Sequence, residues 1–139
     1  MWHGSAVEEL LKDVDHHAAG SRPILNAHSI WELVLHLTVW AGVALRRAQG
    51  EKVNPSDAED WPLPADLDAE GWARDRGRLT DAHKALSAFA AGLSESQLEG
   101  QVAGQDYPLR AMLHGVVEHD CYHGGQIALL RKLVGEGST

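Results

Sequence analysis

The sequence of 139 residues contains a single cysteine, Cys121, so no disulfide can form within the chain and the fold must rest on its hydrophobic core. It has no uninterrupted run of about 18 apolar residues, which argues against a transmembrane helix. The first residues, MWHGSAVEEL, lack the basic and apolar regions of a secretory signal. From these absences we expect a soluble cytoplasmic protein that does not bind a membrane.

Positive charge is also scarce. The chain has 12 lysines and arginines against 20 aspartates and glutamates, a formal net charge of −8. Nucleic acids and anionic membrane surfaces are bound through clustered positive charge. The composition therefore disfavours both as partners.

Helical periodicity dominates the rest of the sequence. Apolar residues recur at helical spacing over 29–49, 68–93 and 108–134. A weaker pattern over 6–14 allows a short first helix of about three turns before Gly20. The sequence thus predicts four helices, and it shows no pair of strands joined by a hairpin turn.

The connections between these helices predict the architecture. The segment EKVNPSDAEDWPLPADL, residues 51–67, contains three prolines and many acids, so it is expected to be a long crossing loop. His28 or Ser29 is positioned to cap the start of the 29–49 helix. We predict an all-α, up-down four-helix bundle that forms one domain over 1–139, with a long crossover loop and a short first helix.

Two histidines of the last helix share one face. His119 and His123 are four residues apart and lie about 40° from each other around a helix, on a stripe that is otherwise apolar. His114 and Cys121 fall on the far side of this helix and are excluded from a shared site. His36, on the 29–49 helix, also lies on a core-facing stripe and is the candidate third partner.

Three core-facing imidazoles can be explained in two ways. A divalent cation satisfies buried ring nitrogens, and sites that do chemistry often combine three protein ligands with an open position. Alternatively, the rings are separate core histidines bonded to neighbouring polar side chains. Spacing alone leaves these alternatives even, because an i, i+4 histidine pair is common by chance and no glutamate directly follows His119, as a zincin motif would require.

The runs HSIWELVLHLTVW and HGVVEHDCYHGGQIALLRK resemble the DinB/YfiT-like superfamily, a group of bacterial four-helix-bundle proteins. The similarity extends from Pro23 to Lys132. It implies a DinB-like bundle in which the second helix supplies one histidine ligand to a divalent metal and the last helix supplies two. Matched residue by residue, these ligands are His36, His119 and His123, the same three that helical geometry selects.

The resemblance implies a family of possible activities. Some members transfer low-molecular-weight thiols to electrophiles, as bacillithiol transferases do, or use a thiol to isomerise maleylpyruvate, and many have no established activity. We therefore expect a divalent metal such as zinc, nickel or iron, a possible thiol co-substrate and a small-molecule substrate. Two alternatives stay open: a non-catalytic, metal-stabilised bundle that binds a small ligand or partner in stress response, and a metal-assisted hydrolase.

Polar residues near the proposed ligands have candidate roles. Asp120 is the candidate catalytic residue. Either Asp120 or Glu32 could accept a hydrogen bond from an imidazole N–H or act as a general base. On wheel angle, however, both carboxylates are expected to meet solvent. Gln126 could orient His123 or a bound water. Arg47 and Arg131 could hold a substrate carboxylate at the mouth of a pocket, but arginines near helix C-termini usually complement the helix dipole, so neither is taken as a site residue.

The outer face of the last helix suggests self-association. Leu113, Val117, Cys121 and Ala128 form a second apolar strip, through which we expect a homodimer; burial by neighbouring helices of the same chain explains it almost as well. The remaining histidines are expected to be surface or capping residues: His3, His16, His17, His28 and His83.

Overall fold

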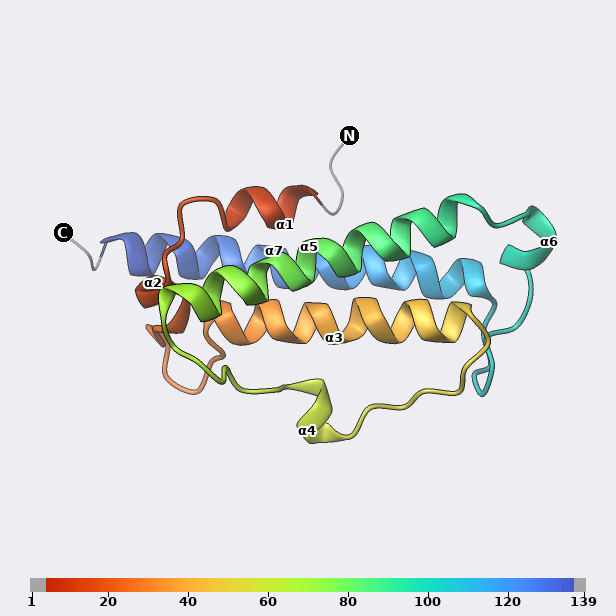
Figure 1. Ribbon diagram of the computed structural model, residues 1–139, viewed down its shortest axis with the longest axis horizontal. Helices are drawn as coiled ribbons and strands as arrows, with labels where there is room; N and C mark the ends of the chain where they lie inside the picture. The colour runs from red at the N-terminus through yellow and green to blue at the C-terminus, as the bar shows by residue number, and fades with distance from the viewer. Residues whose placement is uncertain (1–4, 137–139) are drawn as a thin grey trace.

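The computed structural model describes residues 5–136, and His3 lies outside this range. Within it the chain forms seven helices and no strand (Figure 1), which confirms the all-α class. None of the helices in this range combines the length and the apolar character needed to cross a bilayer.

Three long helices form the body of the molecule. They are α3 (Ile30–Ala48), α5 (Ala69–Ala91) and α7 (Leu109–Glu136). In Figure 1, α3 and α5 run in the same direction and α7 runs against both. The parallel pair requires the chain to return along the whole bundle after α3, and the segment 49–68 does this as the predicted crossing loop.

The starts of α3 and α5 agree with the sequence prediction because the capping residues are local. The side chain of Ser29 accepts a hydrogen bond from the backbone N–H of Glu32, and the Glu32 side chain reaches back to the N–H of Ser29. Asp68 accepts in the same way from the N–H of Gly71. The crossing loop approaches this point so closely that a Cβ at Gly71 would lie 2.0 Å from the carbonyl oxygen of Asp66, so only glycine fits there.

The N-terminal helix prediction is wrong in one respect. Instead of one short helix, the chain forms α1 (Ser5–Leu10) and α2 (His16–Gly20). Asp15 causes the break, because its carboxylate accepts from the N–H of Ala18 and starts a new helix. Val7 and Leu11 are buried, and α1 packs against α7.

Two short helices lie in the connections. α4 (Asp57–Asp60) sits in the crossing loop, and α6 (Glu95–Leu98) precedes a single antiparallel bridge between Gln101 and Pro108. Both helices start with a serine capping box. α6 was not predicted from the sequence.

The core consists of two clusters along the bundle. The larger one centres on Trp31, whose indole N–H donates to the buried carboxylate of Asp75 at 2.9 Å. The smaller one joins Ala44, Leu86 and Met112. His36 lies on α3 among residues of the larger cluster, next to Leu37, so the polar site described next interrupts an otherwise apolar interior.

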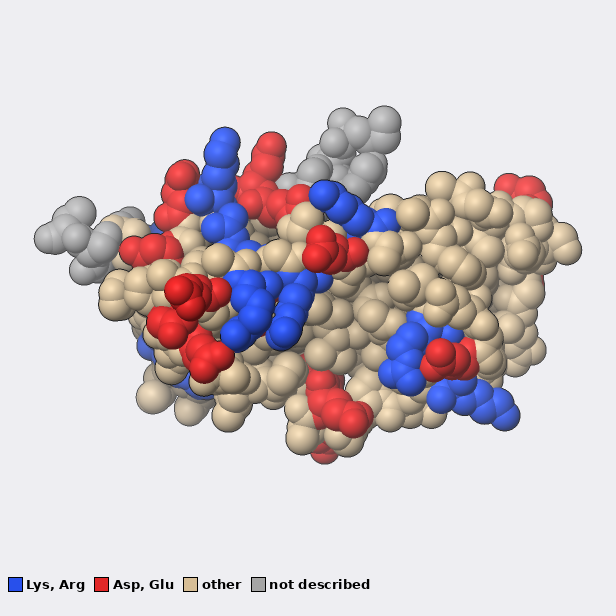
Figure 2. All heavy atoms as spheres, in the orientation of Figure 1, with Lys and Arg blue, Asp and Glu red and all other residues tan. Residues whose placement is uncertain are grey.

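Charge is mixed on the face shown in Figure 2. Basic side chains gather over the first half of α5 and over the end of α3 and the loop that follows it, and acidic side chains adjoin both groups. Arg74 pairs with Asp66 in the first group, and Arg46 pairs with Glu51 in the second. No broad basic surface is visible on this face.

Candidate metal centre

The rings of His36, His119 and His123 converge, and we call them the histidine triad. Nε2 of His119 lies 3.0 Å from Nε2 of His36 and 3.1 Å from Nε2 of His123. One ligand atom from each ring lies within 4.8 Å of the others. His36 and His123 are buried and His119 is partly buried, so the helical-wheel prediction that these rings meet is confirmed.

His36 is held in one orientation by the crossing loop. Its Nδ1–H donates to the backbone carbonyl of Asp60 at 2.8 Å, and a carboxylate oxygen of the same residue lies 3.1 Å away. That carboxylate also accepts from the indole N–H of Trp40 at 2.5 Å. The proton on Nδ1 leaves the lone pair of Nε2 directed into the triad.

His123 is fixed in the same tautomer by its own helix. Its Nδ1–H donates to the side-chain oxygen of Gln126 at 2.6 Å. The predicted orienting role of Gln126 thus matches its position. Nε2 of His123, like that of His36, is therefore an acceptor that faces His119.

The triad brings acceptors together without enough donors. A single proton on Nε2 of His119 can form a good hydrogen bond to only one of its two neighbours at a time. The other lone pair then faces a ring nitrogen in a largely dry environment, which is unfavourable. A cation at the common point would satisfy all three nitrogens, so the donor set fits a metal ion.

An aromatic layer covers one side of the triad. The indole of Trp61 stacks on His36 with 3.7 Å between ring centroids and on His28 at the same distance, with interplanar angles of 4° and 5°. His28 also donates through Nδ1 to Glu32 at 2.8 Å. This layer excludes water from one side of His36 and restrains its ring.

The environment keeps two of the imidazoles neutral. Burial, with a smaller contribution from the charge of His123, lowers the pKa of His119 to about 4. Burial also lowers the pKa of His36. Neutral imidazole is the form that binds a metal, so both rings are ready to act as ligands at neutral pH.

The expectation that Glu32 and Asp120 meet solvent is wrong. Glu32 is 4% exposed and Asp120 is 9% exposed. Glu32 receives hydrogen bonds from His28, Arg22 and Ser29; burial raises its pKa, but these partners together outweigh burial and the pKa is lowered. Its carboxylate therefore supports the start of α3 and the stacked His28.

Asp120 points to a partner outside the triad. Its Oδ2 lies 3.1 Å from Nε2 of His83, a residue of α5. The side chain of His83 is only 11% exposed, so the expectation of a surface position is wrong for this histidine. The carboxylate raises the pKa of His83 against the opposing effect of burial.

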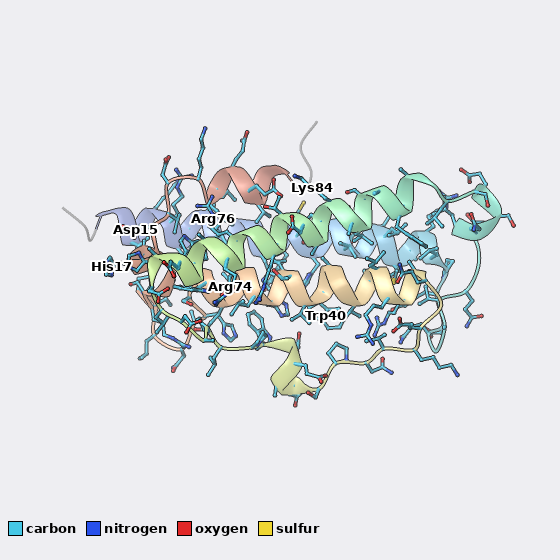
Figure 3. The ribbon with its side chains drawn as sticks, viewed as in Figure 1. Asp15, His17, Trp40, Arg74, Arg76 and Lys84 are labelled. Atoms are coloured by element: carbon cyan, nitrogen blue, oxygen red, sulfur yellow. The ribbon has the colours of Figure 1, made fainter. Side chains whose placement is uncertain are left out.

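Two hollows flank the triad. One, of about 280 Å³, is lined by Trp40, Arg47, Tyr107 and Met112 and reaches His119. The other, of about 430 Å³, is lined by residues that include His28, Trp61, Tyr122 and Gln126 and reaches His123. They share no lining residue. Figure 3 shows Trp40 on the side of α3 that faces the crossing loop.

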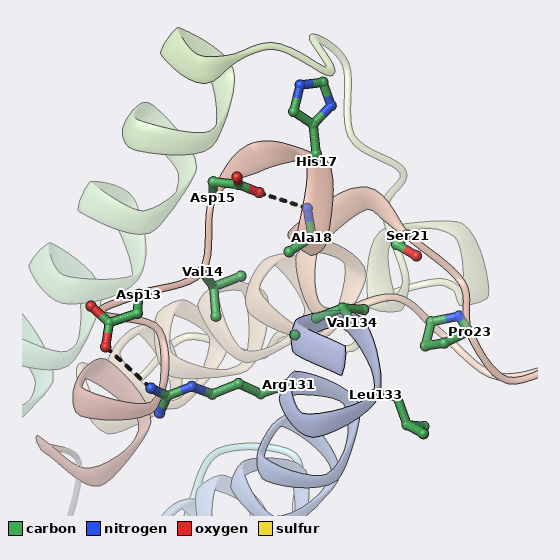
Figure 4. Close-up of a pocket in the computed structure, with 11 residues that line it drawn as sticks. Asp13, Val14, Asp15, His17, Ala18, Ser21, Pro23, Arg131, Leu133 and Val134 are labelled. Carbon is green, nitrogen blue, oxygen red and sulfur yellow. Dashed lines mark hydrogen bonds and ion pairs between the residues drawn. The ribbon is translucent and has the colours of Figure 1, made fainter. Parts of the chain in front are cut away.

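A larger hollow lies away from the triad, where α1 and α2 meet the end of α7 (Figure 4). Its lining includes no triad histidine, and its main polar groups are already committed. Arg131 donates to Asp13 at 3.3 Å, and Asp15 caps α2. Among the described residues, the group that could hold a metal ion is the histidine triad, so no metal centre is assigned to this hollow.

Sequence reasoning missed the contribution of the crossing loop. Asp60 and Trp61 lie in a segment without periodicity, so nothing local predicted that they cover His36. One signal was present: Trp61 is a large aromatic residue in an acidic, proline-rich stretch. Tryptophan is mostly buried in proteins, so its presence indicates that this part of the loop packs against the bundle.

Comparison with known protein families gives one match. A family model described as the DinB superfamily matches residues 2–127. That range contains all three triad histidines and most of α7. No curated protein and no solved structure matches the chain.

Proposed function

The chain belongs to the DinB superfamily, and we propose that it is a metal-dependent protein that holds one divalent ion at His36, His119 and His123. The observation that carries this proposal is the meeting of three Nε2 atoms, two of them fixed as acceptors by Asp60 and Gln126. Separate core histidines would each direct their lone pairs toward donors instead.

The spacing of the nitrogens supports one shared ion. Ligands about 2.0–2.1 Å from a tetrahedral ion lie about 3.3 Å from one another. Two of the three separations, 3.0 and 3.1 Å, are close to this value, and the third is no more than 4.8 Å, so the rings are near the arrangement that one shared ion requires. Three imidazoles suit zinc, nickel or iron, and the donor set does not select among them.

We further propose that the chemistry is transfer of a low-molecular-weight thiol to an electrophile. A divalent ion with three protein ligands would supply an open position at which a thiol loses its proton more readily. In the transfer, the sulfur forms a bond to an electrophilic carbon, the leaving group departs with its bonding electron pair, and the thiol proton passes to solvent.

The two hollows support a reaction with two reactants. They approach the triad along different parts of α3 and α7, one reaching His119 and the other His123. A thiol and an electrophile could therefore enter from separate sides. Hydrolysis needs only one bound reactant and a base, and its candidate base, Asp120, is engaged with His83.

Metal content and thiol transfer test these steps separately. We expect purified protein to contain about one divalent ion per chain and His119→Ala to contain almost none. The exposed His114 on the same helix supplies a control, because His114→Ala should keep the ion. Equal, substoichiometric metal in all three proteins would remove the site.

Thiol consumption then tests the reaction. The wild type is assayed with common bacterial thiols and a model electrophile such as 1-chloro-2,4-dinitrobenzene, beside His119→Ala. Transfer that depends on His119 supports the transferase. A metal that stabilises the protein without transfer by any thiol would instead support the non-catalytic bundle that binds a small ligand or partner.

We also propose that the protein pairs through the outer face of α7. Val117 is 47% exposed there and Cys121 is exposed, while Leu113 packs partly against the chain's own core. An added Cβ at Gly125, which lies about 40° from Cys121 around the helix, would meet nothing within 4 Å, so the backbone at this edge of the strip is open to a neighbour.

A further inference from the structure

The hollow that reaches His119 has a cation in its wall. Its other walls are mainly apolar, with Trp40 and Val43 from α3 and Met112 and Val116 from α7. Arg47 supplies the one charged side chain of the lining at neutral pH, where His119 is neutral. An apolar hollow with a single fixed charge is the usual form of a site for a small amphiphilic ligand.

Three neutral groups hold the Arg47 guanidinium in place. Nε donates to the carbonyl of Val53 at 2.9 Å, Nη1 to the hydroxyl of Tyr107 at 3.1 Å, and Nη2 to the side-chain oxygen of Asn54 at 3.1 Å. The guanidinium also lies over Trp40, 5.7 Å from the ring centroid. Its five N–H donors are therefore only partly used, and its orientation is fixed before any ligand binds.

The charge of Arg47 has no counter-ion in the described part of the chain. No carboxylate there lies within ion-pair distance of it, although the protein has a net charge of −8. The neighbouring Arg46 pairs with Glu51, and other arginines with acid partners are Arg22, Arg74, Arg78, Arg110 and Arg131. A carboxylate of a ligand would meet an oriented, unneutralised guanidinium at Arg47.

We propose that this hollow binds the electrophilic substrate of the transferase, and that this substrate is a small carboxylic acid with an apolar body. Its carboxylate bonds to Arg47, its body lies between Trp40 and Met112, and its reacting end points toward His119. That the ligand is a substrate rests on the proposed transferase function. The carboxylate site itself rests on the geometry around Arg47.

The size of the hollow limits the ligand. At about 30 Å³ for each water molecule in the liquid, 280 Å³ holds about nine non-hydrogen atoms. Hexanoate is a suitable probe of this size. Hexanamide has the same shape without the charge, so it is the matched neutral ligand.

Binding of the two probes tests the charge. Each is titrated into ¹⁵N-labelled protein, and the indole N–H resonance of Trp40, assigned with Trp40→Phe, reports occupancy of the hollow. We expect hexanoate to bind about tenfold more tightly than hexanamide, as one charge-assisted contact would give. Equal affinities for the acid and the amide would overturn the proposal.

Two variants separate ligand binding from a purely structural role of Arg47. Arg47→Gln should abolish the preference for hexanoate, and Arg47→Lys should retain part of it. Arg46→Gln, which changes the adjacent residue, should leave it unchanged. A structural role alone would weaken both probes equally in Arg47→Gln; if this variant does not fold, the acid-to-amide ratios in the wild type and in Arg47→Lys still decide the outcome.

The metal is controlled by repeating the titrations after treatment with a chelator. A preference for hexanoate that persists without metal and is lost in Arg47→Gln places the carboxylate at Arg47, even if the proposed transferase activity fails. A preference that requires metal and is unaffected by Arg47→Gln would place the carboxylate on the ion and overturn the inference. Loss of metal binding and loss of the carboxylate site are thus distinguishable.

Discussion

Asp120 and His83 form a pair inside the protein, with 3.1 Å between Oδ2 and Nε2 and side chains that are 13% and 11% exposed. Asp120 directly follows His119 in the sequence, yet its carboxylate lies beside the ring of His83 on α5 and not in the histidine triad. The pair joins α5 to α7 beside the triad. Catalysis by Asp120 stays a prediction, whereas its contact with His83 gives it a structural role.

Replacing His83 should change stability in a pH-dependent way. Asp120 raises the pKa of His83 in the folded protein, so the favourable contribution of the charged ring is fully present below its ordinary value of 6.5. It is lost as the pH rises through the raised pKa. The free energy of unfolding in urea should therefore be higher for wild type than for His83→Gln by roughly 1–3 kcal/mol at pH 6, and by less at pH 9. A constant difference would contradict the charged pair.

Gln126 should control metal affinity without being a ligand. Its side-chain oxygen accepts from Nδ1 of His123 and fixes the ring tautomer. Gln126→Leu removes this acceptor, and we expect metal affinity to fall by about 10–100-fold, as for other groups that orient a ligand. Gln126→Glu keeps an acceptor and should retain affinity. Competition with a chromophoric chelator measures both variants, and an unchanged affinity in Gln126→Leu would show that the bond does not orient His123.

Acid should destabilise the metal-free protein through His119. Burial lowers the pKa of this ring from 6.5 to about 4, so its contribution to stability is present above 6.5 and is lost as the pH falls toward 4. The shift sets a ceiling of about 3 kcal/mol, and partial exposure to solvent reduces this to about 1–2 kcal/mol.

Chelated protein unfolded by urea at several pH values tests this. Wild type should lose more stability than His119→Asn between pH 7 and pH 4, because asparagine has no proton to take up. His114→Asn, with its change on the exposed face of the same helix, should follow wild type. Parallel curves for wild type and His119→Asn would show that His119 titrates normally.

Periodicity made the ligand helices predictable. His36, His119 and His123 each occur within an apolar stripe, and a stripe on a long helix determines which side chains face the core. The same signal was present for His83, which lies four residues after Leu79 and three before Leu86 on the stripe of α5. A surface position was predicted because the spacing of His83 gives no shared face with the triad, and that prediction was wrong.

The parts that could not be predicted depend on the path of irregular backbone. Asp60 orients His36 through a carbonyl oxygen, which every residue possesses, so its identity carries no signal. Trp61 reaches His36 only because the crossing loop runs back along α3. The sequence offered Arg47 as a possible partner of a substrate carboxylate but favoured an ordinary role at a helix end, because the contacts that hold its guanidinium, with Val53, Asn54 and Tyr107, come from distant or irregular segments.

Cys121 gives a direct test of the proposed dimer. It is exposed on α7 in the same strip as Val117, and it is the chain's only cysteine. In a two-fold dimer centred on this strip, Cys121 would lie near its own copy, because an isologous interface brings the same residues together. Mild oxidation should then produce a disulfide-linked dimer in high yield at low protein concentration.

The control changes the surface and keeps the cysteine. Val117→Glu places a charge in the strip, and we expect it to convert the dimer to a monomer in light scattering and to lower the yield of cross-linked product. Glu118→Gln, at the next and also exposed position, should do neither. A monomeric wild type that cross-links only slowly and in proportion to concentration would show that α7 leaves this strip to solvent, since random collisions, and no stable interface, would then bring the cysteines together.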